Sequence, residues 1–214
     1  MLEFKNVSYR YEKSAVNALT DINYKFESNK FYAITGQSGA GKSTFISLIS
    51  GLDKPLSGTI LYMGGDMRKM DLNLYRSREI GIIFQNYNLL TKSTAVDNVM
   101  MGLYLSGKKG FEKKEAYKLL ESIGIPKQKA DRTILNLSGG EQQRTAIARA
   151  LAGEPNIIIA DEPTGNLDEV NSEIINDILK NLVIKEKKCV IVATHSKQTA
   201  NKADCVINMD AGTI

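Results

Sequence analysis

Residues 36–44, GQSGAGKST, restrict the fold more than any other stretch of the chain. They match the pattern G-x-x-x-x-G-K-[ST], in which glycines let successive backbone N–H groups curve around phosphate oxygens. The lysine of this pattern reaches the β and γ phosphates of a nucleotide, and the serine hydroxyl binds Mg²⁺. An apolar strand pattern precedes the loop and a helical pattern follows it, as the motif requires. A chance match in a chain of this length is about a one-in-a-hundred event, so a mere glycine-rich turn is the weaker interpretation. The predicted phosphate-binding residues are Gly36, Gln37, Ser38, Gly39, Ala40, Gly41, Lys42, Ser43 and Thr44.

The hydrophobic pattern predicts an α/β fold with a mostly parallel core sheet, because short β-branched runs alternate with helical patterns. The predicted buried strands are residues 31–36, 80–85, 156–161 and 189–195, and the predicted helices are 42–51, 113–123, 140–151 and 171–184. Two early stretches, 2–11 and 19–28, alternate apolar and polar residues instead and predict a small antiparallel sheet. Residues 87–150 are mainly helical in pattern, so we expect one domain over 1–214 with an inserted helical lobe at roughly 87–150.

The segment NIIIADEPTGNLD, residues 156–168, supplies two adjacent carboxylates at the end of a predicted buried strand. Asp161 lies where it can hold Mg²⁺ beside the phosphate loop. Glu162 follows directly, and a second carboxylate there suits the polarisation of an attacking water. The structural alternative is an acidic turn broken by Pro163.

Two further residues are predicted at the same edge of the sheet. His195, the sole histidine, closes the run CVIVATH, and Gln85 closes IGIIFQ. A single histidine is more often structural than catalytic, but ligands of open α/β sheets bind at the carboxyl ends of the strands. Gln85 could bind Mg²⁺ or water there, or could simply cap its strand.

A second candidate anion site lies in LSGGEQQRTAIARAL, residues 137–151. Ser138 and Glu141 match an S-x-x-E capping box, with Leu137 in the position of a hydrophobic staple. That interpretation leaves Gly139 and Gly140 unexplained, because each costs a helix up to about 1 kcal/mol. A helix N-terminus with exposed N–H groups binds anions, so the stretch predicts a second phosphate contact.

Composition and charge exclude several classes of function. No apolar run reaches the about 18–20 residues of a membrane span and the N-terminus has no signal core, so we expect a cytosolic chain. The net charge of +4 arises from short lysine runs without interleaved aromatics, which argues against nucleic-acid binding. Cys189 and Cys205 lack C-x-x-C spacing and are expected to be buried free thiols. NKAD, residues 201–204, resembles a guanine-reading motif but follows a polar, helix-like stretch, which argues against that role.

Together these motifs resemble the nucleotide-binding subunit of ATP-binding cassette (ABC) transporters over essentially all of residues 1–214. LSGGEQQR matches the signature motif of that family. The resemblance implies an ATPase that uses ATP and Mg²⁺ and works as a head-to-tail homodimer, in which Ser138, Gly139 and Gly140 of one copy cover the γ-phosphate held by Lys42 of the other. By the same resemblance Lys42, Glu162 and His195 are catalytic, with Glu162 as the general base. It assigns Mg²⁺ to Ser43, Gln85 and Asp161.

The resemblance also places Tyr11 against adenine, with Tyr9 as the rival or with both as strand packing, and Asp168 across the dimer interface. An integral membrane permease is the implied partner, which would hold the chain at the cytoplasmic face of the membrane. ADEPTGNLD and IGIIFQNYNLL are most similar to the subgroup of macrolide exporters, lipoprotein-releasing complexes and antimicrobial-peptide resistance pumps. Soluble family members that act on ribosomes or DNA carry two cassettes or a long coiled coil, which this sequence lacks. A non-catalytic regulatory cassette would be expected to have degenerate carboxylate or histidine positions, and these are intact.

Overall fold

The computed structural model describes residues 1–12 and 14–214, and its core is a five-stranded parallel sheet in the order β6-β7-β8-β3-β9. The strands are β3 (Phe31–Thr35), β6 (Ile80–Ile83), β7 (Ile157–Asp161), β8 (Cys189–Ala193) and β9 (Cys205–Asn208). Side chains of the central strands alternate between two apolar clusters. Ile157 and Ile159 of β7 face one cluster, whereas Ile158 and Ala160 face the other. A strand buried on both faces reads as a continuous apolar run, which is why its sequence predicted it.

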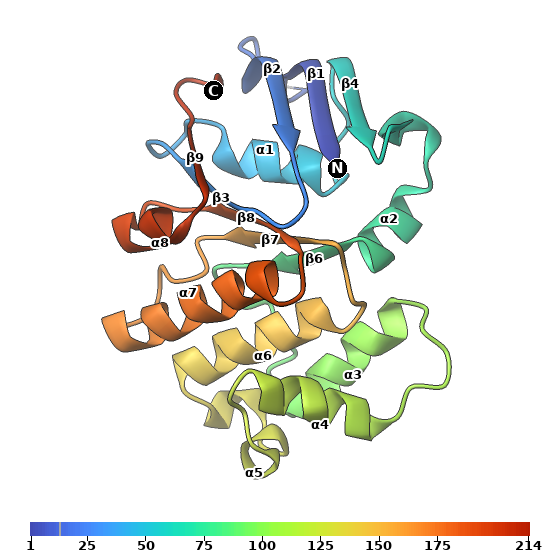
Figure 1. Ribbon diagram of the computed structural model, residues 1–214, viewed down its shortest axis with the longest axis vertical. Helices are drawn as coiled ribbons and strands as arrows, with labels where there is room; N and C mark the ends of the chain where they lie inside the picture. The colour runs from blue at the N-terminus through green and yellow to red at the C-terminus, as the bar shows by residue number, and fades with distance from the viewer. Residues whose placement is uncertain (13) are drawn as a thin grey trace.

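A four-stranded antiparallel sheet, in the order β2-β1-β4-β5, lies above the parallel sheet in Figure 1. Its strands are β1 (Leu2–Tyr9), β2 (Leu19–Phe26), β4 (Ser57–Tyr62) and β5 (Gly65–Asp66). The predicted antiparallel pairing of the first two stretches is confirmed, with Leu2 opposite Phe26 and Tyr9 opposite Leu19. Helix α1 (Lys42–Ile49) is sandwiched between the two sheets, and Phe45 of this helix packs against Phe4 and Phe26.

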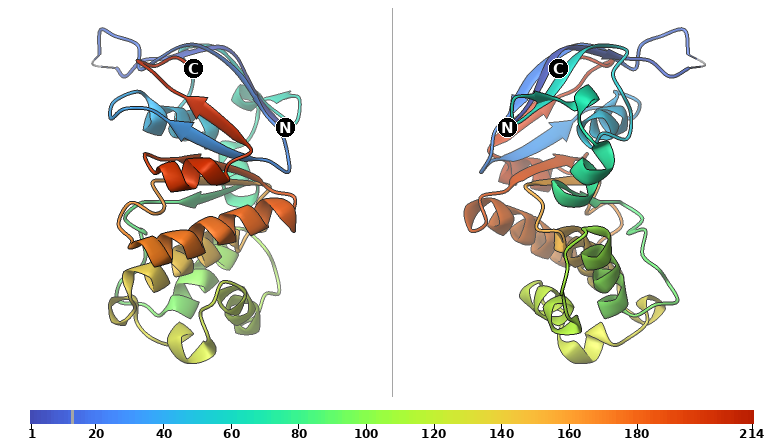
Figure 2. Two further views of the ribbon diagram at one scale, coloured as in Figure 1. Left: turned by 60° about the vertical axis from the view of Figure 1, so that its left-hand side comes forward. Right: turned by 90° about the vertical axis from the view of Figure 1, so that its right-hand side faces the viewer.

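Helices cover the other face of the parallel sheet, as Figures 1 and 2 show. Helices α6 (Gly139–Leu151) and α7 (Glu169–Ile184) bury Ile147, Ile175 and Leu179 in the cluster formed with Ile158 and Val190. Helices α3 (Ala95–Leu105), α4 (Lys113–Ser122) and α5 (Lys127–Ala130) form a lobe beyond α6, with their own apolar cluster. Helix α6 contributes Ala148 and Ala152 follows it in that cluster, so α6 joins the lobe to the sheet.

The boundaries differ from the predictions in a few places. Helices α6 and α7 begin one and two residues earlier than predicted, because Ser138 and Asp168 cap them. Strand β8 ends at Ala193, so His195 lies two residues beyond the strand instead of closing it. Cys189 is buried as expected, but Cys205 is only partly buried. The described chain also contains helix α2 (Leu72–Arg78), helix α8 (Lys197–Lys202) and the short 3₁₀ turns η1 (Met67–Lys69) and η2 (Ile134–Asn136).

Candidate nucleotide site

A pocket of about 400 Å³ opens at the carboxyl ends of the parallel strands. It gathers residues from the loops after β1, β3, β6, β7 and β8. Its lining residues are Tyr11, Ala18, Ser38, Gly39, Gly41, Lys42, Ser43, Thr44, Gln85, Asp161, Glu162 and His195. All except Ala18 are predicted site residues. Gly36, Gln37 and Ala40 of the predicted loop do not line the pocket.

The phosphate loop folds around its own lysine. The buried Lys42 ammonium donates to the carbonyls of Gly36 (2.9 Å) and Gln37 (3.0 Å), so it is held inside the loop. Gly41 precedes α1 with a φ of +105°, and a Cβ there would lie 2.9 Å from the carbonyl oxygen of Ala18. Only glycine combines this backbone conformation with so close an approach. The loop therefore presents a cation and the start of α1 to the pocket.

Ser43 and Asp161 form a small oxygen-rich pair beside the lysine. The Ser43 hydroxyl donates to Asp161 Oδ2 at 3.3 Å. Burial raises the pKa of Asp161, while the Ser43 hydrogen bond and the Lys42 charge oppose the rise. Mg²⁺ in nucleotide sites uses one or two protein oxygens and completes its shell with phosphate and water. Ser43 and Asp161 together offer two such oxygens, so they fit a Mg²⁺ ion that is also held by phosphate.

Glu162 is fixed in place by the end of β8. Its backbone has a φ of +46°, a conformation that is uncommon outside glycine and that clusters at functional sites. Its Oε2 accepts from the Thr194 hydroxyl (3.3 Å) and from the backbone N–H of His195 (3.2 Å). Its Oε1 is buried and, in the described part of the chain, has no hydrogen-bond partner. The carboxylate thus keeps one acceptor oxygen available at the pocket.

His195 stands between the lysine and the carboxylate. Its Nε2 lies 3.2 Å from Lys42 Nζ and 3.4 Å from Glu162 Oε1. Because an ammonium group only donates, Nε2 is the acceptor in this arrangement and the ring proton belongs on Nδ1. That assignment agrees with Glu162 Oε1 having no hydrogen-bond partner among the described residues.

Tyr11 forms one wall of the pocket, and Tyr9 does not line it. The Tyr11 hydroxyl is 2.7 Å from the Thr44 hydroxyl, and the residue is 49% exposed. The Tyr9 ring stands edge-on to it, with centroids 5.1 Å apart, and packs against the core. Of the two tyrosines, the geometry therefore offers Tyr11 to a ligand.

Besides those three loop residues, four predicted residues lie outside this pocket, namely Ser138, Gly139, Gly140 and Asp168. Ser138 caps α6 by accepting from Glu141 N–H, while the Glu141 carboxylate accepts from the Ser138 N–H at 2.9 Å. The predicted capping box is therefore confirmed. Ser138 and Gly139 are nevertheless exposed, and Gly140 is buried. Asp168 is the exposed cap of α7.

The comparisons with known proteins agree with these features. The family model of the ABC transporters matches residues 19–165, which include the phosphate loop and both carboxylates. The chain belongs to the ABC transporter family. It is 43% identical over 215 residues to YclH of Bacillus subtilis, an uncharacterized ABC transporter ATP-binding protein, covering 100% of this chain and 95% of that one.

The chain is also similar to a second relative and to a solved structure. The chain is 41% identical to the macrolide export ATP-binding/permease protein MacB of Chlorobaculum tepidum, matched over 100% of this chain but 33% of that protein. The fold is similar to that of the ATP-binding cassette MJ0796, solved as a dimer in a post-hydrolysis state with ADP and Pi. The TM-score is 0.91 at 35% identity, covering 100% and 96% of the two chains. The α/β fold is thus that of an ABC cassette, and the chain is an ATPase of this family.

Three residues that support the site were not predicted. Thr194 contacts Glu162 directly and is adjacent to His195 in the sequence, which is the signal that could have identified it. Gln143 of α6 is fully buried and donates to the carbonyl of Pro163 at 2.7 Å, next to Glu162. Arg149 of α6 donates to the carbonyls of Tyr87 and Asn88, just after Gln85, at 2.9 and 2.6 Å. These contacts join α6 to both loops, and they depend on a packing arrangement that no local pattern encodes.

The NKAD segment has a structural role at the start of β3, outside the pocket. Asp204 accepts from the backbone N–H of Phe31 at 2.8 Å and pairs with Lys180 of α7. It does not line the pocket. The expectation that this segment does not read guanine is consistent with its position.

Proposed function

We propose that two copies of this chain hydrolyse ATP as a head-to-tail dimer, with each ATP held between the Lys42 pocket of one copy and the α6 N-terminus of the other. One observation carries the proposal. The pocket holds a cation, two carboxylates and a histidine, but its lining includes no residue of the signature segment. The α6 N-terminus, in turn, is exposed at Ser138 and Gly139, and the lysine beside its first turn, Lys129, is paired with the Glu141 carboxylate. Each is half of a phosphate site.

The similarity to MJ0796 supports this arrangement, because that cassette was solved as a dimer with ADP and Pi. In the proposed dimer Asp168, the exposed cap of α7, reaches across the interface beside Ser138. Tyr11 stacks on adenine at the outer wall of the pocket, where the residue is half exposed. The phosphates lie in the loop of residues 36–44.

The chemistry follows from the polar groups of the pocket. Lys42 faces the β and γ phosphates, and its charge stabilises the negative charge that develops as the bond to the leaving ADP breaks. Glu162 Oε1, a buried acceptor with no hydrogen-bond partner among the described residues, takes the proton of the water that attacks the γ-phosphorus. His195, within 3.4 Å of that oxygen, contacts the γ-phosphate. Ser43, Asp161 and Gln85 would hold Mg²⁺, which would neutralise phosphate charge.

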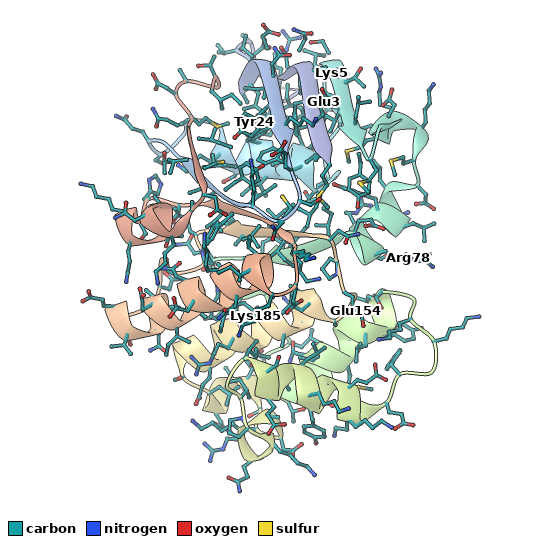
Figure 3. The ribbon with its side chains drawn as sticks, in the orientation of Figure 1. Glu3, Lys5, Tyr24, Arg78, Glu154 and Lys185 are labelled. Atoms are coloured by element: carbon teal, nitrogen blue, oxygen red, sulfur yellow. The ribbon has the colours of Figure 1, made fainter. Side chains whose placement is uncertain are left out.

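The proposed partner is an integral membrane permease, which holds the cassette at the cytoplasmic face of the membrane. The name of MacB joins an ATP-binding part to a permease. Among the described residues no helix combines the length and apolar character needed to cross a bilayer. A hollow of about 170 Å³ between β6, α3 and α6 includes Arg149 and Leu105, and it lies near the Gln85 loop. Arg78 and Glu154, labelled in Figure 3, line a neighbouring hollow. The exposed Tyr104 and Leu105 of α3 give this face an apolar surface.

A mixing experiment tests the composite site. Lys42→Ala removes the cation of the pocket, and Ser138→Arg blocks the α6 N-terminus, so each variant alone should lack ATPase activity. In a heterodimer both defects fall in one site, and the other site is built from unaltered residues. ATPase activity should therefore return on mixing, once cross-linking has confirmed that heterodimers form at the concentration used.

A photoreactive ATP analogue gives a second measurement on the same mixture. In the intact site it should label both chains, because both contribute to that site. Labelling of the Ser138→Arg chain alone, or no return of activity in confirmed heterodimers, would contradict the composite site and leave residues 138–141 as an ordinary capping box.

A further inference from the structure

The two glycines of the signature segment have different surroundings. Gly139 is exposed, and the nearest atom to a Cβ at this position would be the Tyr87 hydroxyl at 3.3 Å. Gly140 is buried, and a Cβ there would lie 2.0 Å from Asn171 Oδ1 and 2.5 Å from Asn171 Cγ. Real side chains do not approach so closely. Asn171 of the same chain therefore excludes any side chain at position 140, whereas a Cβ at position 139 would meet only the ends of two side chains, the Tyr87 hydroxyl at 3.3 Å and Leu167 Cδ2 at 3.7 Å.

Asn171 lies in the first turn of α7 and makes several contacts. Its Nδ2 donates to both carboxylate oxygens of Asp168, at 3.0 and 2.9 Å. Its Oδ1 faces the guanidinium of Arg144 on α6 at 3.4 Å. The backbone N–H of Asn171 also donates to Asp168, at 2.7 Å, as the cap of α7. These backbone and side-chain hydrogen bonds lower the pKa of Asp168. The Asn171 amide thus fills the space between the N-terminal ends of α6 and α7.

We propose that Asn171 is a positioning residue that sets Asp168 against the N-terminus of α6, and that residue 140 is glycine in order to admit the Asn171 side chain. The inference rests on the proposed function, in which Asp168 and Ser138 face the partner together. Gly139 is then the glycine left free for the partner's phosphate. A side chain at position 140 would rotate Asn171 away from Asp168, because the Oδ1 and Cγ atoms occupy that space.

A double-mutant cycle separates this explanation from one in which the nucleotide alone requires Gly140. Asn171→Ala removes the amide but keeps the α7 cap, whose donor is the backbone N–H of residue 171. It leaves a 3.2 Å contact between the two Cβ positions, which a small shift can relieve. Gly140→Ala should lower kcat about tenfold, and Asn171→Ala should lower it less. The double variant should have the kcat of Asn171→Ala alone, because residues in contact are not additive.

The unfolding midpoint without nucleotide provides a readout that does not depend on catalysis. Gly140→Ala should lower the midpoint in the wild-type background. In the Asn171→Ala background the same change should leave it equal or raise it, because alanine favours a helix over glycine. If Gly140→Ala alone does not fold, a folded double variant supports the contact. A protein without ATPase activity or ATP-driven dimerisation would contradict the proposed function, while this midpoint pattern would still test the contact.

Two matched variants control for bulk and position. Asn171→Leu keeps the branched shape of asparagine without its hydrogen bonds, so it should not rescue Gly140→Ala. Asn171→Ala should not rescue Gly139→Ala, because position 139 does not contact Asn171. The proposal is overturned if the losses at 140 and 171 multiply in kcat, or if Gly140→Ala lowers the midpoint equally in both backgrounds.

Discussion

The Lys42 pocket and the α6 N-terminus are both predicted to bind phosphate, but they differ in how completely the chain builds them. The pocket is concave, and its buried lysine is held by two loop carbonyls. The α6 end is exposed, and its polar groups already satisfy one another in the capping box. The pocket gathers charged side chains that the packing of the fold does not require. At the α6 N-terminus, helix capping alone is enough to explain Ser138 and Glu141.

The two regions therefore give different kinds of evidence for phosphate binding. A buried acceptor without a partner costs free energy, and Glu162 Oε1 is such an acceptor within the described chain, on a residue that also lines the pocket. Ser138 does not lower the stability of the fold, because its hydroxyl caps α6 whether or not a phosphate binds. Variants that separate capping from anion binding are therefore the most informative for the second region.

The largest expected effect concerns the pocket. Glu162→Gln keeps the size of the side chain but removes the base, so hydrolysis should fall by about 10²-fold or more. ATP binding should persist because the phosphate contacts remain. The variant should accumulate as an ATP-bound dimer on a sizing column. Normal turnover, or a monomer at saturating ATP and high protein concentration, would count against this role.

A smaller effect separates the two roles of Ser138. Ser138→Asp keeps a good helix cap but places a negative charge beside the partner's γ-phosphate. ATPase activity should fall by about tenfold or more, the equivalent of about 1.4 kcal/mol in the barrier, while the unfolding midpoint without ATP stays unchanged.

Ser138→Ala is the matched control for this prediction. It removes the cap, at a cost of about 1 kcal/mol of stability, and adds no charge. Its unfolding midpoint should fall while it keeps more activity than Ser138→Asp. The opposite ranking of the two activities would mean that residue 138 acts only as a helix cap.

The parts predicted from the sequence are those that a local pattern encodes. β7 and β8 were predicted because both faces of each strand are apolar, and α6 because of its cap and periodicity. β9 was not predicted because it is a short edge strand with exposed positions. β4 begins with an exposed serine and a glycine at φ +79°, which weakens its strand pattern. The contacts of Gln143, Arg149 and Asn171 join segments that are far apart in the sequence, and no single segment encodes them.

The smallest expected effect compares two carboxylates, Asp161 of the pocket and Asp204 of the structural NKAD segment. Burial raises the pKa of Asp161 above its ordinary 3.8, against the Ser43 hydrogen bond and the Lys42 charge. Burial acts the same way on Asp204, but the Lys180 and Phe31 hydrogen bonds outweigh it and lower the pKa. Above its raised pKa, ionised Asp161 therefore destabilises the folded state, whereas ionised Asp204 stabilises it.

Replacing each carboxylate by its neutral amide should thus shift stability in opposite directions. Without nucleotide and with a chelator present, Asp161→Asn should raise the unfolding midpoint at neutral pH, by about 2 °C or less for a chain of this size, although it should impair ATP hydrolysis. The gain should disappear as the pH falls through the raised pKa of Asp161 towards 3.8, where the wild-type carboxyl is also neutral. Asp204→Asn should lower the midpoint at neutral pH, and its deficit should shrink as the pH falls through the lowered pKa of Asp204. Midpoints measured by calorimetry over this pH range test both signs. If Asp161→Asn instead lowers the midpoint at neutral pH, the contacts of the folded chain alone stabilise the ionised Asp161 carboxylate, and its stability gives no sign of a cation site.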